Sequence, residues 1–423
     1  MKIRIFWVVF TALLLLVTYA WVSTAHFGPL DIFYIRLANQ FFAVLGVVFI
    51  FMQFVLSARI KTLEEGFGLD KMLHYHRYFG RIGLIFLALH GLLYIIYELL
   101  EFGGVMTHFY FWLGIIAFIG FLITASLAVL YKRIGITYEA WKNIHLFNYV
   151  LFPLALIHVF YNASTGTLLY YLWIAFAVAY ALIILYRVYQ IYRMRSNPYQ
   201  VIEVKQEAED IWTVSFKGRE FSYKPGQFLM MQLLRDGVLS PSHPFTLSSS
   251  PTWDHISITP KESGDFTATI KETKVGDKAF IDAPYGVFSF LNYDAHELVF
   301  IAGGIGITPF MSMLRYISEK QLPLEVTLFW GNKDESSLCF QEELEMFQEK
   351  MHNFSSILIM SKQKNWPGEQ GRINAQLIQK YLPDLEGKDF FVCGPPAMSN
   401  AVMAELQKIK VPASKIHREL FDF

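Results

Sequence analysis

The spacing of apolar residues differs between the two halves of the chain. In residues 1–192, long apolar runs alternate with short polar stretches. Six runs approach the roughly 20 apolar residues that a helix needs to cross a bilayer. We place them at 5–24, 34–57, 75–99, 109–131, 142–161 and 167–191. From Tyr199 onward the runs become short and alternate with polar residues, which is typical of strands. The pattern predicts an all-α bundle of six transmembrane helices followed by a soluble half.

The soluble half divides again near residue 294. The runs VIEVKQ, IWTVSF, FLMMQL, HISITP and KAFIDAP alternate in polarity and are separated by turns, so they predict an antiparallel β-barrel. From Glu297, the runs ELVFIAG, EVTLFWGNKD, SSILIMSKQ and DFFVCGPPAM are followed by helical stretches, which predicts a parallel α/β sheet. The predicted domains are 1–192, 193–294 and 295–423.

Composition supports this division and excludes some classes of function. The chain has 423 residues, of which 54% are hydrophobic, and its formal net charge is zero. A neutral chain argues against a nucleic-acid partner, and the length suggests two or three domains. The two cysteines, Cys339 and Cys393, offer neither a disulfide framework nor a metal-binding cluster, which fits a reducing compartment.

The charges in the loops predict the orientation of the bundle. Loops on one side carry most of the lysines and arginines, including Arg133 and Lys142, whereas the opposite loops carry Asp31 and Glu101 with almost no cations. The positive-inside rule then places both termini and the soluble half in the cytoplasm. The first run resembles a signal peptide but lacks a convincing cleavage site, so we expect an uncleaved anchor in the cell membrane.

Four histidines lie in two spaced pairs within the apolar half. His76 and His90 are fourteen residues apart in one run, and His145 and His158 are thirteen apart in another. Ionisable side chains inside a membrane span indicate function. The pairs suggest two metal centres at levels roughly 21 Å apart, each bound by one histidine from each helix. Iron held between two imidazoles has no open position, which suits electron transfer in two haems.

Helix geometry favours one pair more than the other. Fourteen residues return to within roughly 40° of the starting face, but thirteen miss it by roughly 140°. A kink or unwound turn at Pro153 could bring His158 round, because proline removes a backbone hydrogen bond. His74 lies roughly 160° from His90 and is not expected to be a ligand. The alternative is that each histidine is an ordinary packed helix residue.

The predicted barrel carries several short motifs that together indicate a flavin site. HPFTLSS at 243–249 offers the hydroxyls of Thr246 and Ser248 to a flavin ring and Phe245 to flank it. Lys261 and the backbone N–H groups after Gly264 could neutralise a pyrophosphate. Each motif alone is a common strand–turn string. The candidate contacts are His243, Pro244, Phe245, Thr246, Ser248, Lys261, Gly264, Asp265, Phe266 and Thr267.

The predicted parallel sheet carries a glycine-rich turn and a second loop at the edge where ligands bind in such folds. Gly303, Gly304 and Gly306, followed by Thr308 and Pro309, could let the backbone approach a phosphate at a helix N-terminus. The alternative is an ordinary tight strand–helix turn. The second loop, at the end of the last strand, holds Cys393, Gly394 and Pro395. We expect Cys393 to pack beside a nicotinamide rather than to act as a reactive thiol.

Further candidates lie on loops and at the chain end. Ser361 and Lys362 end one strand and could bind a ribose phosphate, with Arg372 as a second cation, or they are surface residues. Arg36 could hold a haem propionate or attract an anionic product, or it extends to the lipid headgroups. Phe421 and Phe423 could stack on a flavin face, or they are stray surface aromatics.

These residues resemble a known family across the whole chain. The six spans with their four histidines resemble the ferric-reductase-like transmembrane domain. HPFTLSS, GDFT, AGGIGITP, VCGPP and HRELF resemble the ferredoxin–NADP reductase module. The combination is that of NADPH oxidases and ferric-chelate reductases, and the compact build resembles bacterial NADPH oxidases. The resemblance implies FAD in the barrel, NADPH or NADH in the sheet domain and two b-type haems in the membrane.

The resemblance also bears on single residues. It places a flavin-stacking aromatic at Phe421, although the two residues after it leave Phe423 as an alternative. Tyr94 lies about where some eukaryotic oxidases have a second outer histidine, proposed near the oxygen site.

The expected activity is electron transfer across the membrane. A hydride would pass from NADPH to FAD, and single electrons would then pass through the inner and outer haems to dioxygen, giving superoxide. Extracellular ferric-chelate reduction is the enzymatic alternative. A transporter with a regulatory nucleotide-binding domain is a third possibility, against which the lack of broken, repeat-like helices counts. No obligatory protein partner is expected.

Overall fold

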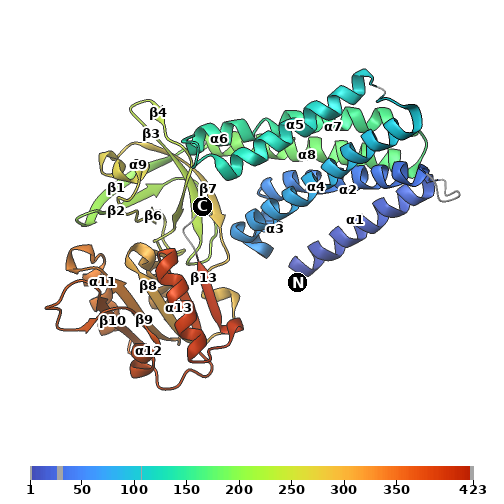
Figure 1. The fold of residues 1–423 in the computed structure, drawn as a ribbon. Coiled ribbons are helices and arrows are strands. Elements are labelled where there is room, and N and C mark those ends of the chain that lie inside the picture. The colour runs from blue at the N-terminus through green and yellow to red at the C-terminus, as the bar shows by residue number, and fades with distance from the viewer. Residues whose placement is uncertain (1, 26–31, 106, 420–423) are drawn as a thin grey trace. The chain divides into compact units, whose positions relative to one another are not determined.

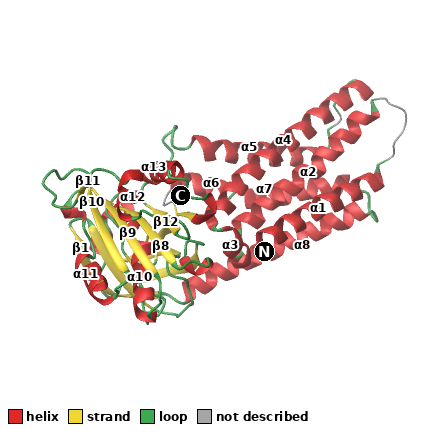
Figure 2. Ribbon diagram, turned by 90° about the horizontal axis from the view of Figure 1, so that it is seen from below, coloured by secondary structure: helices red, strands yellow, loops and turns green. Residues whose placement is uncertain are grey.

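The protein is described here by a computed structural model that covers residues 2–25, 32–105 and 107–419 (Figure 1). The chain separates into two compact units, Met1–Ile191 and Tyr192–Phe423, which are described in turn. The first unit is helical and the second contains both sheets, as the colouring by secondary structure shows (Figure 2).

Six helical segments of the first unit are long and apolar enough to cross a membrane, as predicted. Five of them are single helices, and the fifth in chain order, Tyr138–Asn162, is broken in two. The helices are α1 (Lys2–Thr24), α2 (Phe33–Ser57), the short α3 (Lys61–Phe67), α4 (Leu69–Phe102), α5 (Phe109–Leu130), α6 (Tyr138–His145), α7 (Asn148–Asn162) and α8 (Leu168–Ser196). Helix α4 is longer than predicted and stops at Gly103, whose positive φ of 69° ends the helix in a left-handed turn.

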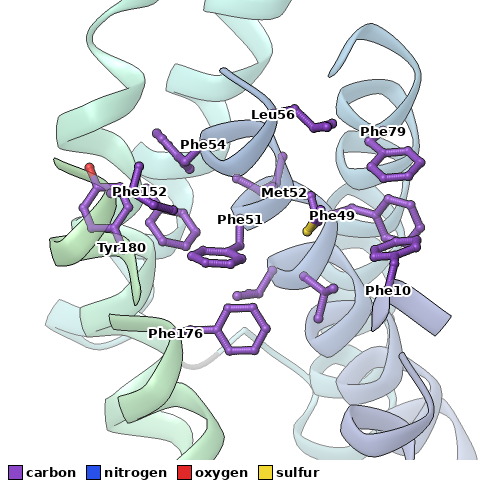
Figure 3. Close-up of a cluster of buried hydrophobic side chains, with 14 of the residues drawn as sticks. Phe10, Phe49, Phe51, Met52, Phe54, Leu56, Phe79, Phe152, Phe176 and Tyr180 are labelled. Atoms are coloured by element: carbon purple, nitrogen blue, oxygen red, sulfur yellow. The ribbon is translucent and has the colours of Figure 1, made fainter. Parts of the chain in front are cut away.

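Helix α2 is central in the bundle. Half of the most apolar stretch of α2 is buried, compared with 11–22% of the corresponding stretch in the other five spans. Aromatic rings pack on both of its sides, as Figure 3 shows: Phe51 meets Phe176 of α8 edge-on at 4.7 Å, and Phe49 meets Phe79 of α4 at 5.2 Å. Gly46 lets α4 approach closely, because an added Cβ would lie 2.6 Å from Leu87. The phenylalanine-rich runs thus supply a packed interior for the helices that carry the histidines.

The second unit begins with the predicted antiparallel sheet. Its strands are β1 (Tyr199–Ala208), β2 (Ile211–Lys217), β3 (Phe228–Arg235), β4 (Val238–Leu239), β5 (His243–Thr246), β6 (Ile256–Ile258) and β7 (Lys278–Tyr285). They are ordered β4-β3-β7-β1-β2-β6, and β5 pairs with β3. The four-residue helix α9 (Asp265–Ala268) interrupts the strands. The alternating runs therefore form strands as predicted, and the HPFT motif itself forms β5.

A six-stranded parallel sheet follows, also as predicted. Its strands are β8 (Glu297–Gly303), β9 (Glu325–Asn332), β10 (Phe354–Met360), β11 (Glu369–Gln370), β12 (Asp389–Cys393) and β13 (Ile416–Glu419). Its helices are α10 (Thr308–Lys320), α11 (Gln341–Lys350), α12 (Ala375–Tyr381) and α13 (Pro396–Lys408). The spatial order is β11-β10-β9-β8-β12-β13, so the chain reverses direction across the sheet between β8 and β12. Ligands bind at such a switch point in open α/β sheets.

Candidate functional site

The four histidines form two facing pairs in the helical unit. The rings of His76 and His145 have centroids 6.1 Å apart, and those of His90 and His158 are 6.2 Å apart. A metal–imidazole bond is about 2.0–2.1 Å long, so two rings on opposite sides of one ion have centroids about 6 Å apart once the ring radii are added. Each pair therefore has the spacing of two imidazoles that share one metal ion.

The sequence led us to expect a helix interruption at Pro153 that would bring His145 and His158 to the same side. The interruption lies elsewhere. Helix α6 ends at His145 and α7 starts at Asn148, so the break falls at Leu146 and Phe147. Helix α7 runs through Pro153. The carbonyl of Tyr149, which loses its helical donor to the proline, accepts a hydrogen bond from the Tyr180 hydroxyl at 2.6 Å instead. The break lets both histidines face α4.

Neighbouring groups orient the rings of the His90–His158 pair. The side chain and the carbonyl of Asn39, which is buried on α2, are hydrogen-bonded to Nδ1 of His90. Nδ1 of His158 donates to the carbonyl of Tyr110 at 2.8 Å. These bonds leave Nε2 of each ring for a metal, the arrangement that orients metal-bound histidines. Sequence reasoning missed Asn39, although a polar residue in an apolar span was a signal.

Gly114 of α5 makes room for the second ring of this pair. An added Cβ at Gly114 would lie 2.8 Å from Nδ1 and 2.9 Å from Cε1 of His158, well inside ordinary contact distance. The ring thus lies directly on the backbone of α5. Any side chain at this position would push His158 away from its partner.

The His76–His145 pair is half-buried in apolar surroundings. Nδ1 of each ring is buried without a hydrogen-bond partner among the described residues. The backbone groups of Gln53 and Thr124 lie near His76 and His145, respectively, so only the facing arrangement of the two rings points to a shared ligand. The ring of Trp141 lies 5.5 Å from that of His145. His74 is exposed, and its ring lies near that of Tyr75.

The number of protein ligands fits haem. No cluster of three or more His, Cys, Asp or Glu side chains able to hold a metal occurs in the part of the chain that the structure covers. Each pair offers two facing imidazole rings, and two protein ligands are what iron needs when a macrocycle supplies the remaining ones. The two other candidates in this unit lie near α4: the guanidinium of exposed Arg36 is 5.9 Å from the ring centroid of Tyr97, and Tyr94 packs on Phe111.

In the second unit, the candidate flavin residues gather around β5. Thr246 ends β5, is buried and pairs in register with Phe228 of β3. His243 stacks on Phe266 with centroids 4.3 Å apart, so the HPFTLSS and GDFT motifs are in contact. Phe245 lies 6.0 Å from the same Phe266 ring, and Pro244 lies between His243 and Phe245 on β5. The Ser248 side chain is fully buried, and its hydroxyl is hydrogen-bonded to that of Thr259 inside the barrel.

The GDFT motif forms α9. The hydroxyl of Thr267 accepts hydrogen bonds from the backbone N–H groups of Gly264 at 2.9 Å and Ser263 at 3.0 Å, while Asp265 lies in the first turn. The predicted pyrophosphate cation, Lys261, is paired with Asp210 at 3.0 Å. A ligand there would have to share this lysine with the carboxylate.

The glycine loop lies at the switch point of the parallel sheet. Cβ atoms at Gly303 and Gly306 would lie 3.1 Å from Pro395 and 2.5 Å from the Cys393 carbonyl, so these glycines let two loops touch. Gly304 is different, because it has a positive φ of 52° and open space beside it. The backbone there is accessible to a phosphate, and the loop leads into Thr308 and Pro309 at the start of α10.

Cys393 and Gly394 complete the other side of the switch point. The thiol of Cys393 is fully buried, and burial raises its pKa well above the usual value. A thiol that stays protonated is a poor nucleophile. The structure thus agrees with a packing role for this cysteine.

Three cations lie at the carboxyl ends of neighbouring strands. Met360 and Gln370 pair in register, so Lys362 and Arg372 follow adjacent strands β10 and β11, and Lys362 N–H donates to the carbonyl of Lys333 after β9. All three cations are exposed and have no ion-pair partner among the residues that the structure describes. The hydroxyl of Ser361 is already bonded to the Asn332 carbonyl. Sequence reasoning missed Lys333 because its place depends on the strand order.

The predicted flavin-stacking aromatics, Phe421 and Phe423, lie outside the described residues. The strand that precedes them, β13, pairs with β12, and His417 within it is anchored. His417 Nε2 donates to Asp389 at 2.8 Å, and its ring stacks on Tyr293 at 3.6 Å. Burial lowers the pKa of His417, an effect that Asp389 partly opposes.

Three family models match the chain in sequence order. "Ferric reductase like transmembrane component" matches residues 42–156, "FAD-binding domain" matches 196–289 and "Oxidoreductase NAD-binding domain" matches 300–404. The first match includes His76, His90 and His145.

Curated relatives match about half of the chain or less. The reductase subunit of glycine betaine monooxygenase from Pseudomonas aeruginosa is 29% identical, over 52% of this chain and 63% of its own length. The electron transfer component of anthranilate 1,2-dioxygenase from Acinetobacter baylyi is 36% identical, over 35% of this chain and 43% of its own length. The chain thus spans between about two fifths and three fifths of these relatives. The ferredoxin NADP+ reductase structure from Neisseria gonorrhoeae covers 53% of the chain at 20% identity, with a TM-score of 0.48.

Proposed function

From the domain architecture of NADPH oxidases and ferric reductases, which this chain has, we propose that electrons from NADPH cross a membrane through it to dioxygen. One NADPH would reduce two dioxygen molecules to superoxide and release NADP+ and a proton. FAD and two b-type haems would be the bound carriers, because a flavin accepts a hydride and haem carries one electron at a time.

The proposal rests mainly on the two facing histidine pairs. Two centroid distances of 6.1 and 6.2 Å fit one iron between each pair. Their α4 members are fourteen residues apart, which places the two levels roughly 21 Å apart along the helix. His76 and His145 would hold the inner haem, and His90 and His158 the outer one. Asn39 and the Tyr110 carbonyl keep the outer rings turned toward each other.

Residues of the second unit would hold the other two cofactors. Thr246 and the aromatic group around Phe266 would bind and orient the flavin, and the open backbone at Gly304 would bind the nicotinamide pyrophosphate. Lys333, Lys362 and Arg372 would bind the extra phosphate of NADPH. We place this unit in the cytoplasm from the loop charges.

A ferric chelate is the second candidate for the acceptor. Arg36 is exposed at the end of α2 that we assign to the outer face, where its charge would attract an anionic chelate. Tyr94 stands about where some oxidases have a second outer histidine, proposed near the oxygen site, and the lack of that histidine favours the second acceptor. Both acceptors would receive electrons from the same outer level.

Two experiments test the function. A reduced-minus-oxidised visible spectrum of the purified protein should show b-type haem bands, and a transporter would show none. NADPH oxidation should consume oxygen and reduce cytochrome c in a manner that superoxide dismutase suppresses. Reduction of a ferric chelate that superoxide dismutase does not affect, with little oxygen consumed, would instead favour the second acceptor.

Haem content in variants tests the ligands. His90→Ala or His158→Ala should remove mainly the outer haem, and His76→Ala or His145→Ala mainly the inner one. Two haems per protein in any of the four variants would contradict the assignment of that histidine.

A further inference from the structure

One face of α10 is polar and docks on the flavin-side segment 248–253. Ser312, Arg315 and Glu319 are three and four residues apart, so they lie along one side of the helix. Ser312 and Arg315 are buried there, whereas Glu319 is exposed. Other residues of the helix, Ile317 among them, pack into the core of the sheet domain. This polar face therefore joins the two domains of the second unit.

The contacts hold the main chain of the flavin-side segment directly. The Ser312 hydroxyl donates to the Ser249 carbonyl at 2.6 Å, and Nη1 of Arg315 donates to the Ser248 carbonyl at 2.6 Å. These carbonyls lie only two and three residues after Thr246, the candidate flavin contact. A shift of α10 would move the backbone next to that residue.

Glu319 extends the same docking contact by one turn. Its carboxylate accepts hydrogen bonds from the Ser250 hydroxyl at 2.7 Å and from Nε1 of Trp253 at 2.6 Å. The Thr252 hydroxyl donates to it as well. Three side chains of the segment therefore converge on one exposed carboxylate.

The guanidinium of Arg315 is itself fixed by an ion pair and by two aromatic rings. Its Nε and Nη2 donate to the two carboxylate oxygens of Glu343 on α11 at 2.7 and 2.6 Å. The guanidinium also lies 4.9 Å from the Trp253 ring and 5.1 Å from the Phe340 ring. A bidentate, ring-stacked arginine is rigid, and lysine cannot reproduce that geometry.

The helix connects this contact to the nucleotide loop. Helix α10 begins at Thr308, immediately after the glycine loop, and Arg315 lies seven residues further along, roughly 10 Å along the axis. A rigid helix thus carries the glycine loop at one end and grips the flavin-side backbone in its middle. Its position sets how far the two candidate cofactor sites are apart.

We propose that Arg315, with Ser312 and Glu319, is a positioning residue that fixes the nicotinamide over the flavin for hydride transfer. The inference rests on the proposed function. In that step the nicotinamide loses a C–H bond with both its electrons and the flavin gains an N–H bond. None of the three side chains is among the candidate contacts to either cofactor. Reacting atoms must lie about 3–3.5 Å apart, and a misplacement of about 1 Å can slow such a step a hundredfold.

The test uses full-length, FAD-loaded protein under anaerobic conditions. Glu319→Ala is the main variant, because Glu319 is exposed and its loss leaves the core intact. The double variant Arg315→Gln with Glu343→Gln removes a buried charge together with its partner, so that no lone charge stays buried. Arg315→Lys tests partial rescue. Ile317→Val is the matched control, because it alters the same helix on its core side.

Three readouts separate positioning from general stability. These are the limiting rate of flavin reduction with its apparent NADPH dissociation constant, the long-wavelength charge-transfer band of stacked nicotinamide and flavin, and hydrogen exchange of segment 248–253 without nucleotide. We expect Glu319→Ala and the double variant to lower the limiting rate about ten- to a hundredfold and to weaken the band. FAD content and NADPH affinity should stay as in the wild type, exchange in the segment should rise, and Ile317→Val should change none of these.

The outcomes separate the two proposals. An unchanged rate and band in Glu319→Ala, with faster exchange in the segment, would show that the contact is structural only and would overturn the inference. A parallel loss of FAD or of NADPH affinity would assign the contact to binding and overturn it as well. Wild-type protein that binds FAD but is reduced by neither NADPH nor NADH would overturn the proposed function, and the inference with it.

Discussion

Adding one methyl group at Gly114 should remove the outer haem and leave the inner one. The Cβ of Gly114→Ala would lie 2.8 Å from His158 Nδ1, whereas ordinary contacts start near 3.4 Å. The ring or the helix must therefore move by at least about 0.6 Å, several times the tolerance of about 0.2 Å for a metal–ligand distance. The Nδ1 bond to the Tyr110 carbonyl would be strained by the same shift.

The expected size of the effect follows from the cost of overpacking. Forcing a methyl group into a packed site costs about 1–3 kcal/mol, which corresponds to about five- to 150-fold weaker binding if the cost falls on the haem-bound state. Haem content per protein should fall from two toward one, with loss of the bands that His90→Ala also removes. The His76–His145 pair should be unaffected, because Gly114 does not touch it.

Gly120→Ala is the matched control on the same helix. Its Cβ would lie 2.5 Å from Leu151 of α7, so it overpacks the same α5–α7 contact without touching a histidine. We expect it to keep both haems, or to lose both alike through lower stability. Gly114→Ala protein with two haems and a wild-type spectrum would refute the placement of His158 against α5.

Four further outcomes are expected. Asn39→Leu should weaken the outer haem about ten- to a hundredfold, as is usual when the group that orients a metal-bound histidine is removed, and haem titration measures this. Lys362→Ala, and likewise Lys333→Ala, should raise the Michaelis constant for NADPH about tenfold through loss of a contact worth about 1.5 kcal/mol, with that for NADH and the maximal rate nearly unchanged. Thr246→Ala should weaken FAD binding or slow flavin reduction by an amount equivalent to about 0.5–1.5 kcal/mol, and unchanged flavin affinity and reduction would argue against the contact. Burial lowers the pKa of His417 in the folded state, so the unfolded state takes up the proton first as the pH falls. The free energy of unfolding should therefore keep its full value above about pH 6.5 and decrease below it. His417→Gln should reduce that decrease, as measured by denaturant titrations.

The sequence was sufficient for features that depend on local periodicity. Apolar length predicted the six spans, alternating polarity predicted the antiparallel sheet, and strands followed by helical stretches predicted the parallel sheet. The fourteen-residue spacing of His76 and His90 predicted a shared face, and the structure places both of them opposite a histidine. Helix periodicity did not predict how His145 and His158 come to face α4, because the break at Leu146 and Phe147 has no proline or glycine to mark it.

Features that depend on which segments meet could not be predicted. Lys333 joins the cation group only because β9 lies beside β10, and the Tyr110 carbonyl meets His158 only because α5 packs on α7. The polar positions of Ser312 and Arg315 on α10 were visible in the sequence. Without the second domain they would have been taken for a solvated helix face.

The helix pairing also has a consequence for the stability of the bundle in the cell. Helix α4 packs along α2 and α7 packs along α5, and the two pairs meet where the histidines face each other. Phe51 and Phe54 of α2 already contact Phe152 of α7, so the two pairs share one core. A ligand bound by both His90 and His158 would add a second connection between them. A ligand that binds only the folded bundle stabilises it by mass action, so the stability of the protein in the membrane would follow the supply of that ligand.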